Sequence, residues 1–191
     1  MNTNKENKKQ KRTGGFTLDQ TILVVAVIAV LATVIISSVA WTVLTRANAT
    51  KMTAHLAQVA DAIGNYYQDN SNDWPQDAED LAQYLAGYSI DTNDLITPFG
   101  TSTTPSKLVY DSTGKSLSKP GESGVACVVA DKDCYFTVTM SEIQAQEAEE
   151  ANNAVDGKSE GADAKTKGRL RWTDGAGTTR VTITYFAVKK P

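Results

Sequence analysis

The feature that most constrains the fold of this chain is a run of 24 residues, 21–44, without one charged side chain. As an α-helix the run would be about 36 Å long, and the hydrocarbon core of a bilayer is about 30 Å thick. Valine and isoleucine are frequent in it, but a sheet with unpaired edges cannot lie in lipid. The run therefore predicts a membrane-spanning helix.

Charge is distributed unevenly on the two sides of this run. Residues 1–15 hold five Lys or Arg and one Glu, a net charge of +4, and the other 176 residues hold 14 Lys or Arg and 21 Asp or Glu, a net charge of −7. The basic flank of a membrane span stays in the cytoplasm. Nucleic acid is not expected as a partner, because its broad electrostatic capture needs a basic face.

The helical pattern continues beyond the apolar run. No proline or glycine occurs in residues 16–63. Apolar residues recur there at spacings of three and four: Met52, Leu56, Val59, Ile63 and Tyr66 or Tyr67. We therefore expect one helix of roughly 50 residues, lipid-buried in its first half and amphipathic in its second. Turn-forming residues at 69–75 would end it, and a sheet is expected to cover its apolar stripe.

The remaining residues predict a small antiparallel sheet with short helices, so the fold class is α+β. The expected elements are a helix at 77–86, a loop at 97–106, strands at 107–110, 125–130 and 135–140, an exposed helix at 142–154, a mobile loop at 155–168, and a hairpin of strands 169–173 and 179–188 around 174–177.

Cys127 and Cys134 are the two cysteines of the chain, with six residues between them. Both lie in the part that the basic leader would place outside the cytoplasm. A disulfide closing a short loop is the simplest interpretation. A structural zinc site is the weaker alternative, because zinc needs two further ligands and the chain has one histidine, His55.

The junction Gly15-Phe16-Thr17-Leu18, between the basic leader and the apolar run, resembles the prepilin peptidase site of type IV pilins and type II secretion pseudopilins. The resemblance implies cleavage between Gly15 and Phe16 and methylation of the new amino group of Phe16. Two looser similarities concern the helix exit and the Asp-Pro-Trp-Gly region of these families: Tyr66-Tyr67 before Trp74-Pro75, and Pro98-Phe99-Gly100 before 108–110. The N-terminal match covers about 30 residues.

The resemblance implies a domain organisation and a function. The expected parts are a cleaved leader (1–15), a transmembrane and filament-core helix (16–44), the amphipathic half of that helix (45–70) and a globular pilin-like head (71–191). Such a chain is a structural subunit of a type IV pilus or pseudopilus-like filament. It starts as a single-pass protein of the bacterial inner membrane with a cytoplasmic N-terminus, and ends in a surface filament or a periplasmic pseudopilus.

The implied partners are prepilin peptidase, other pilin subunits in a homo- or hetero-filament, the inner membrane, and the pilus or secretion assembly machinery. Motility, secretion, conjugation and competence systems all remain open. A competing function is a membrane-anchored or secreted extracytoplasmic binding protein that does not assemble. Its leader could be an uncleaved anchor, or an ordinary signal peptide cut after Ala40.

One departure from the family concerns assembly. Most members carry a glutamate where this chain has Gln20, and that glutamate is thought to pair with a neighbouring subunit's N-terminus. Here the carboxylate is one residue earlier, at Asp19, which turns it by about 100° around a helix. Either Asp19 takes over the pairing in a rotated packing, or the subunit lacks the pairing and stands at a fibre tip or in an initiating complex.

No cofactor is expected. Asp156, Glu160 and Asp163, with glycines nearby, are similar to the calcium loop of major pseudopilins, and Ca²⁺ there is the alternative to a solvated charged loop. The one histidine, His55, is expected at the surface, so no catalytic triad can be formed and the chain is not expected to be an enzyme.

The last hairpin carries several cationic and aromatic side chains that could contact DNA: Arg169, Arg171, Trp172 and Arg180. Cross-strand pairs on the surface of a sheet are the preferred interpretation of these residues.

Overall fold

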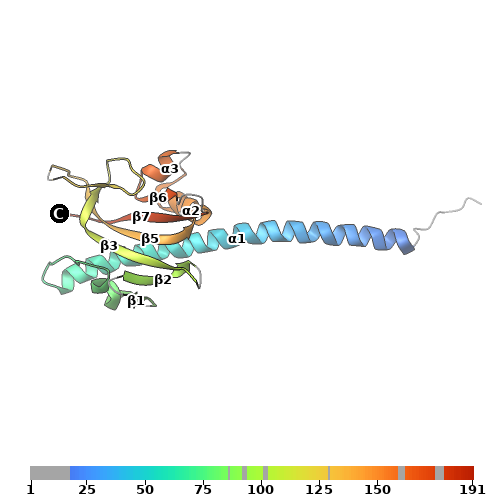
Figure 1. The fold of residues 1–191 in the computed structure, drawn as a ribbon, viewed down its shortest axis with the longest axis horizontal. Helices are drawn as coiled ribbons and strands as arrows, with labels where there is room; N and C mark the ends of the chain where they lie inside the picture. The colour runs from blue at the N-terminus through green and yellow to red at the C-terminus, as the bar shows by residue number, and fades with distance from the viewer. Residues whose placement is uncertain are drawn as a thin grey trace, which may run out of the picture. The chain divides into compact units, whose positions relative to one another are not determined.

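The computed structural model describes residues 18–85, 87–91, 94–100, 103–128, 130–158, 162–174 and 179–191. Within them a long N-terminal helix is followed by a small antiparallel sheet, which confirms an α+β fold (Figure 1). The helices are α1 (Leu18–Asp69), the 3-10 helix η1 (Glu79–Tyr84), α2 (Ala145–Asp156) and α3 (Ala162–Thr166). The strands are β1 (Ser89–Asp91), β2 (Asp94–Gly100), β3 (Pro105–Ser116), β4 (Val125–Ala126), β5 (Cys134–Gln144), β6 (Leu170–Asp174) and β7 (Arg180–Lys189). The chain divides into two units, Met1–Thr42 and Val43–Pro191.

In the first unit, the described residues belong to α1 and expose their apolar side chains. Two hydroxyl groups donate hydrogen bonds to backbone carbonyls one turn earlier, Thr33 to Ala29 and Ser37 to Thr33, each at 2.8 Å. This bonding keeps both hydroxyls satisfied without water. Over the described residues, α1 is the one helix long and apolar enough to cross a membrane, and its most apolar window is not buried at all.

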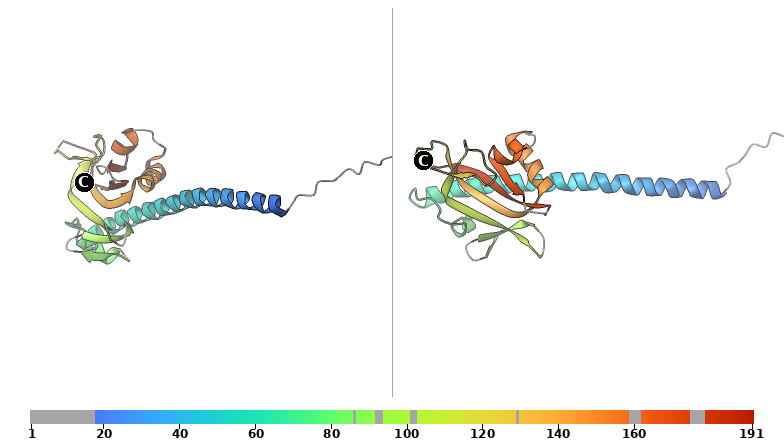
Figure 2. Two further views of the ribbon diagram at one scale, coloured as in Figure 1. Left: turned by 45° about the vertical axis from the view of Figure 1, so that its right-hand side comes forward. Right: turned by 45° about the horizontal axis from the view of Figure 1, so that its top comes forward.

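In the second unit, the predicted apolar stripe of α1 is confirmed. Met52, Leu56, Val59 and Ile63 are at most 1 % exposed and belong to the core cluster that includes the sheet residues. Figure 2 shows the sheet lying along this part of α1. Burial of this stripe is what keeps an amphipathic helix attached to the sheet.

The helix ends where the sequence predicts. Ser71 and Asn72 both adopt positive φ angles, of 56° and 67°, which reverse the chain after Asp69. The ring of Trp74 then stacks on Tyr67, with centroids 4.1 Å apart, and lies 4.7 Å from the ring of Phe136. Trp74 therefore joins the exit of the helix to β5.

The strands form a single sheet in the order β1-β2-β3-β5-β7-β6, with β4 paired to β3. Every pair is antiparallel. Val138 of β5 lies opposite Tyr110 of β3 on one side and Tyr185 of β7 on the other. The predicted hairpin is confirmed as β6 and β7, while residues 175–178 of its turn lie outside the described residues.

The loop expected at 97–106 is wrong for 97–100 and 105–106, which belong to strands, while 103–104 lie between the strands. Residues 94–100 form β2, and β3 already begins at Pro105. Proline argued for a loop, but Pro98 lies where the register between β2 and β3 shifts, between Ile96 and Gly100. A proline in such an irregularity costs no ladder hydrogen bond.

Several other boundaries differ from the expected ones. The helix expected at 77–86 is the six-residue 3-10 helix η1, and the strand expected at 125–130 is limited to the two residues of β4. Conversely, β3 has 12 residues and β5 has 11, both longer than predicted. Both strands are paired with a neighbour on each side. This pairing extends them beyond the residues in which apolar and polar side chains alternate most clearly.

The region 142–168 differs most from its prediction. The helix α2 begins only at Ala145, and Glu147, Ala148, Ala151 and Asn152 on one face are buried, so it is not an exposed helix. The expected mobile loop contains α3 and is held at its base by Asp156. The Asp156 carboxylate accepts hydrogen bonds from the backbone N–H groups of Arg169 and Leu170, each at 2.8 Å.

Candidate functional site

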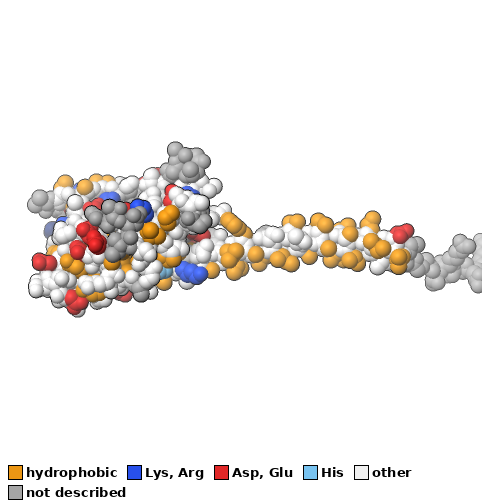
Figure 3. Space-filling view, turned by 60° about the horizontal axis from the view of Figure 1, so that its bottom comes forward, with side chains coloured by type: hydrophobic (Ala, Val, Ile, Leu, Met, Phe, Trp, Pro, Cys, Tyr) orange, Lys and Arg blue, Asp and Glu red, His pale blue; other side chains and the backbone are white. Residues whose placement is uncertain are grey.

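The first half of α1 presents a continuous apolar surface. Leu18 is 78 % exposed and Ile36 is 66 % exposed, and large apolar side chains between them are exposed at successive positions. Because successive residues are about 100° apart, such a run covers all sides of a helix. Figure 3 shows hydrophobic side chains along this segment. An exposed apolar area this continuous indicates contact with lipid or with apolar helices.

The residues proposed for processing and assembly flank the start of this surface. Gly15 and Phe16 lie outside the described residues. Asp19 and Gln20 lie in the first turn of α1, where both residues are exposed. Neighbouring side chains on a helix point about 100° apart, so Asp19 and Gln20 face different directions. Whether Asp19 takes over the pairing or the subunit lacks it stays a prediction.

The disulfide between Cys127 and Cys134 is present, with Cα atoms 5.9 Å apart, so the zinc alternative for these cysteines is wrong. The Asp131 carboxylate stabilises the loop they close. It accepts hydrogen bonds from the Lys119 ammonium at 2.7 Å and from the Val128 N–H at 2.9 Å. The bond from Lys119 is the main reason why the pKa of Asp131 is lowered.

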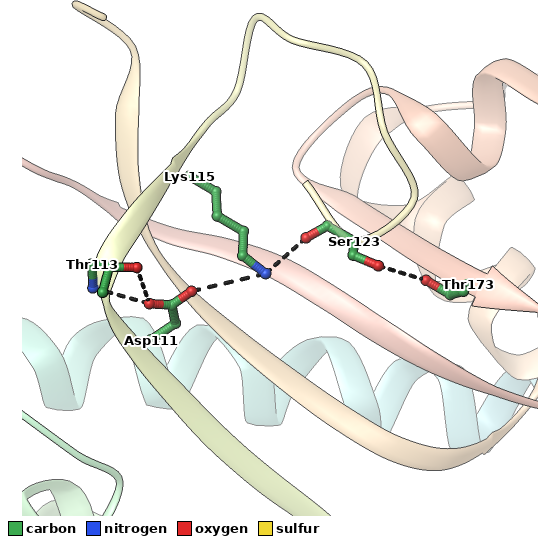
Figure 4. A network of polar contacts seen from close by, with 5 residues as sticks. All are labelled: Asp111, Thr113, Lys115, Ser123 and Thr173. Carbon is green, nitrogen blue, oxygen red and sulfur yellow. Dashed lines mark hydrogen bonds and ion pairs between the residues drawn. The ribbon is translucent and has the colours of Figure 1, made fainter. Parts of the chain in front are cut away.

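A polar network connects β3, the segment before β4, and β6 (Figure 4). The Lys115 ammonium donates to the Ser123 carbonyl at 2.7 Å and lies 3.8 Å from a carboxylate oxygen of Asp111. The hydroxyls of Ser123 and Thr173 are 3.0 Å apart, and Thr113 donates to Asp111. These groups satisfy one another, so the network acts as a structural clamp.

Arg171 was expected on the surface of the hairpin and is instead fully buried. Its guanidinium donates to the carbonyls of Leu117 at 2.5 Å, Lys119 at 2.6 Å and Gly168 at 3.0 Å. It also lies over the ring of Phe186, 4.4 Å from the centroid. Burial lowers the pKa of Arg171.

The other three candidate residues of the hairpin are also buried or hydrogen-bonded within the protein. Trp172 is 4 % exposed, Arg169 donates to the carbonyls of Phe186 and Ala187, and Arg180 donates to the Glu142 carbonyl at 2.6 Å. Arg171 and Trp172 therefore form neither the DNA contact nor the surface pair that the sequence suggested.

The three candidate calcium ligands have different surroundings. Asp156 binds backbone N–H groups, Asp163 forms an ion pair with Lys167 at 2.8 Å, and Glu160 lies outside the described residues. Gly168, at a φ of 84°, lets the backbone pass so close to Asp156 that a Cβ atom there would clash with its carboxylate. In the described part of the chain, no group of three or more His, Cys, Asp or Glu is placed to hold a metal.

A polar pocket of about 270 Å³ in the head was not predicted. Its walls come from α1, β2, β5, α2 and β7: Asn48, Lys51, His55, Pro98, Phe99, Gly100, Gln144, Glu147 and Arg180. These residues are far apart in the sequence, and most belong to segments predicted as loop or exposed helix. Only the fold brings them together, so no local pattern could have indicated the pocket.

His55 forms one wall of this pocket, so its prediction as a plain surface residue is wrong. Its Nδ1 atom lies 2.8 Å from the Tyr88 hydroxyl, and its ring meets the Phe99 ring edge-on at 5.2 Å. Burial lowers the pKa of His55 and raises the pKa of Tyr88 to about 12. The imidazole is therefore neutral at pH 7.

No known family, no curated protein sequence and no solved structure matches this chain. The residues of the chain itself therefore have to indicate its function.

Proposed function

We propose that this chain is a structural subunit of a type IV pilus or pseudopilus-like filament, processed by prepilin peptidase and assembled from the inner membrane. The observation that carries the proposal is the uninterrupted helix α1, directly after the Gly15-Phe16 junction. Its first half exposes apolar side chains, and one face of its second half is buried under the sheet. A lipid anchor that later becomes a filament core needs both properties in one helix.

The first half of α1 can serve in both environments for one physical reason. Lipid tails and the apolar side chains of neighbouring subunits both lack hydrogen-bonding groups, so a helix that satisfies its own polar atoms suits either. The hydroxyls of Thr33 and Ser37 are bonded within the helix. Extraction from the membrane into a filament then exchanges one apolar environment for another.

The head supplies the outer surface of the filament. Its disulfide suits an oxidising compartment, which agrees with a head outside the cytoplasm. With the basic leader in the cytoplasm, the chain crosses the inner membrane once before assembly. The role is structural, with prepilin peptidase, other subunits and the assembly machinery as partners.

Mass spectrometry of the mature N-terminus tests this proposal. Cleavage after Gly15 and methylation are expected to leave an N-methylated Phe16 as the first residue. Deletion of the peptidase gene in the same cells should leave the leader attached. A mature chain that begins at Met1 or at Trp41 would contradict the proposal.

The polar pocket of the head favours a second candidate, an extracytoplasmic binding protein that is anchored or secreted and does not assemble. The two candidates differ in whether fibres form. Electron microscopy of sheared surface fractions from cells with and without this protein separates them: fibres that disappear with the gene support the filament, and unchanged preparations support the binding protein.

A further inference from the structure

We propose that the pocket between α1, β2 and α2 binds one ring of a neutral sugar. The inference does not depend on the filament function, since a head of either proposed class could carry such a site. Four features support it: an incompletely paired carboxylate, balanced charge, a strained residue that holds Arg180, and an aromatic side chain in the lining.

The carboxylate belongs to Glu147, which is only 9 % exposed although it lines the pocket. It accepts one hydrogen bond, from the Asn48 side-chain amide at 2.7 Å, and it forms no ion pair with any described residue. A carboxylate offers about four lone-pair sites, and burying a charge is costly unless its sites are used. Glu147 therefore presents unused acceptor positions to a ligand that donates hydrogen bonds.

The charges around the pocket balance, which argues against a simple ion as ligand. Lys51 and Arg180 contribute positive charge and Glu147 negative charge, while His55 is neutral. Arg180 is compensated by Glu142, whose carboxylate lies 3.9 Å from the Arg180 Nε atom. A pocket without excess charge, whose lining includes both hydrogen-bond donors and acceptors, fits a neutral ligand that carries several hydroxyl groups.

Glu142, the partner of the pocket residue Arg180, has a φ angle of 60°, in the left-handed region that favours glycine. It lies within the register shift between β5 and β7, where Arg180 binds both its carbonyl and its carboxylate. Non-glycine residues held in such a strained conformation cluster at binding sites. The strained turn fixes the guanidinium of Arg180 beside the pocket.

The lining also includes the apolar ring of Phe99. Phe99 is partly exposed, and its ring is held edge-on by His55 and not by a stacked neighbour. An aromatic ring in this position can cover the C–H face of a pyranose, while the polar walls bind its hydroxyls. The volume of about 270 Å³ is just below the range typical of drug-sized ligands, so it suits a single ring.

The test uses the full-length chain in a zwitterionic detergent that contains no sugar. Saturation-transfer NMR with glucose, galactose, mannose and N-acetylglucosamine should show transfer to at least one of them, and titration then gives its Kd. Glu147→Gln keeps the acceptor for Asn48 but removes the charge, so Kd should rise about tenfold. Lys51→Met should also raise it, while Glu149→Gln, at an exposed position of the same helix, should leave it unchanged.

Three results would overturn the proposal. The first is no transfer to any of the four sugars. The second is binding of acetate or methylammonium in preference to all of them, which would make the pocket an ion site. The third is an unchanged Kd in Glu147→Gln. Should that variant unfold, Lys51→Met decides, because the exposed Lys51 has no role in the core, and an unchanged Kd there overturns the proposal.

Discussion

In residues 18–41 of α1, large apolar side chains are exposed at successive positions, whereas in residues 49–63 the buried apolar side chains form one stripe. In the proposed role as membrane anchor and filament core, the first region needs only apolar side chains of any shape, since lipid or a neighbouring helix adapts to them. In the second region each side chain fits a particular place in the core. Within one helix, residues 18–41 therefore need only an apolar composition, whereas residues 49–63 need side chains that fit the core. Substitutions in the two regions should have different effects.

The largest effect is expected for a charge in the packed stripe. Leu56→Asp would bury an unpaired carboxylate at a position that is 1 % exposed, and should cost at least about 4 kcal/mol of the free energy of unfolding. Chemical denaturation of the full-length chain, followed by near-ultraviolet circular dichroism, measures it. Ala57→Asp, at the exposed neighbouring position, is the matched control and should change stability by about 0.5 kcal/mol or less. Equal effects of both would show that the stripe is not packed.

A charge in the first half should affect the membrane and not the head. Ile28→Asp places a carboxylate within the apolar run, at a cost of about 3 kcal/mol for membrane insertion near the centre of a span. The fraction of the protein that resists alkaline extraction from membranes should fall, while the unfolding transition of the head stays where it is. Ile28→Leu should change neither. A loss of head stability in Ile28→Asp would contradict the separation of the two regions.

The smallest effect concerns His55, in the packed half. Because burial lowers its pKa in the folded state, the unfolded state takes up the proton first as the pH falls. Stability should therefore decrease as the pH falls below about 6.5, and the decrease should end below the folded pKa. Thermal unfolding between pH 8 and 5 should show a shallower dependence for His55→Gln than for the natural chain. Identical pH profiles would exclude this contribution.

Sequence patterns predicted the elements whose signal is local. The stripe from Met52 to Ile63, the strand at 135–140 and the last hairpin each have a clear period, and each is present in the structure. The disulfide was predicted because both cysteines lie in the part of the chain that was expected outside the cytoplasm. In these cases the residues that decide the structure are close together in the chain.

The features that were missed depend on distant partners. Pro98 suggested a loop, but it lies in strand β2, at a point where the register of β2 against β3 shifts. Arg171 looked like a surface cation, but its partners are carbonyls some 50 residues earlier, at Leu117 and Lys119. Glu147 belongs to a polar helix whose buried face is defined only by contact with the rest of the head. None of these contacts leaves a periodic mark in the sequence.

The strand order has a consequence for biosynthesis. Strand β7 lies between β5 and β6, so the sheet remains interrupted until residues 180–189 have been made. The stripe on α1 ends at Ile63, some 125 residues earlier, and at about 5–20 residues per second the ribosome needs roughly 6 to 25 seconds to reach the end of β7. During that interval the apolar side chains of both halves of α1 lack their final cover. In the proposed role, a newly made chain therefore depends on prompt delivery to a membrane or on a chaperone until its sheet can close.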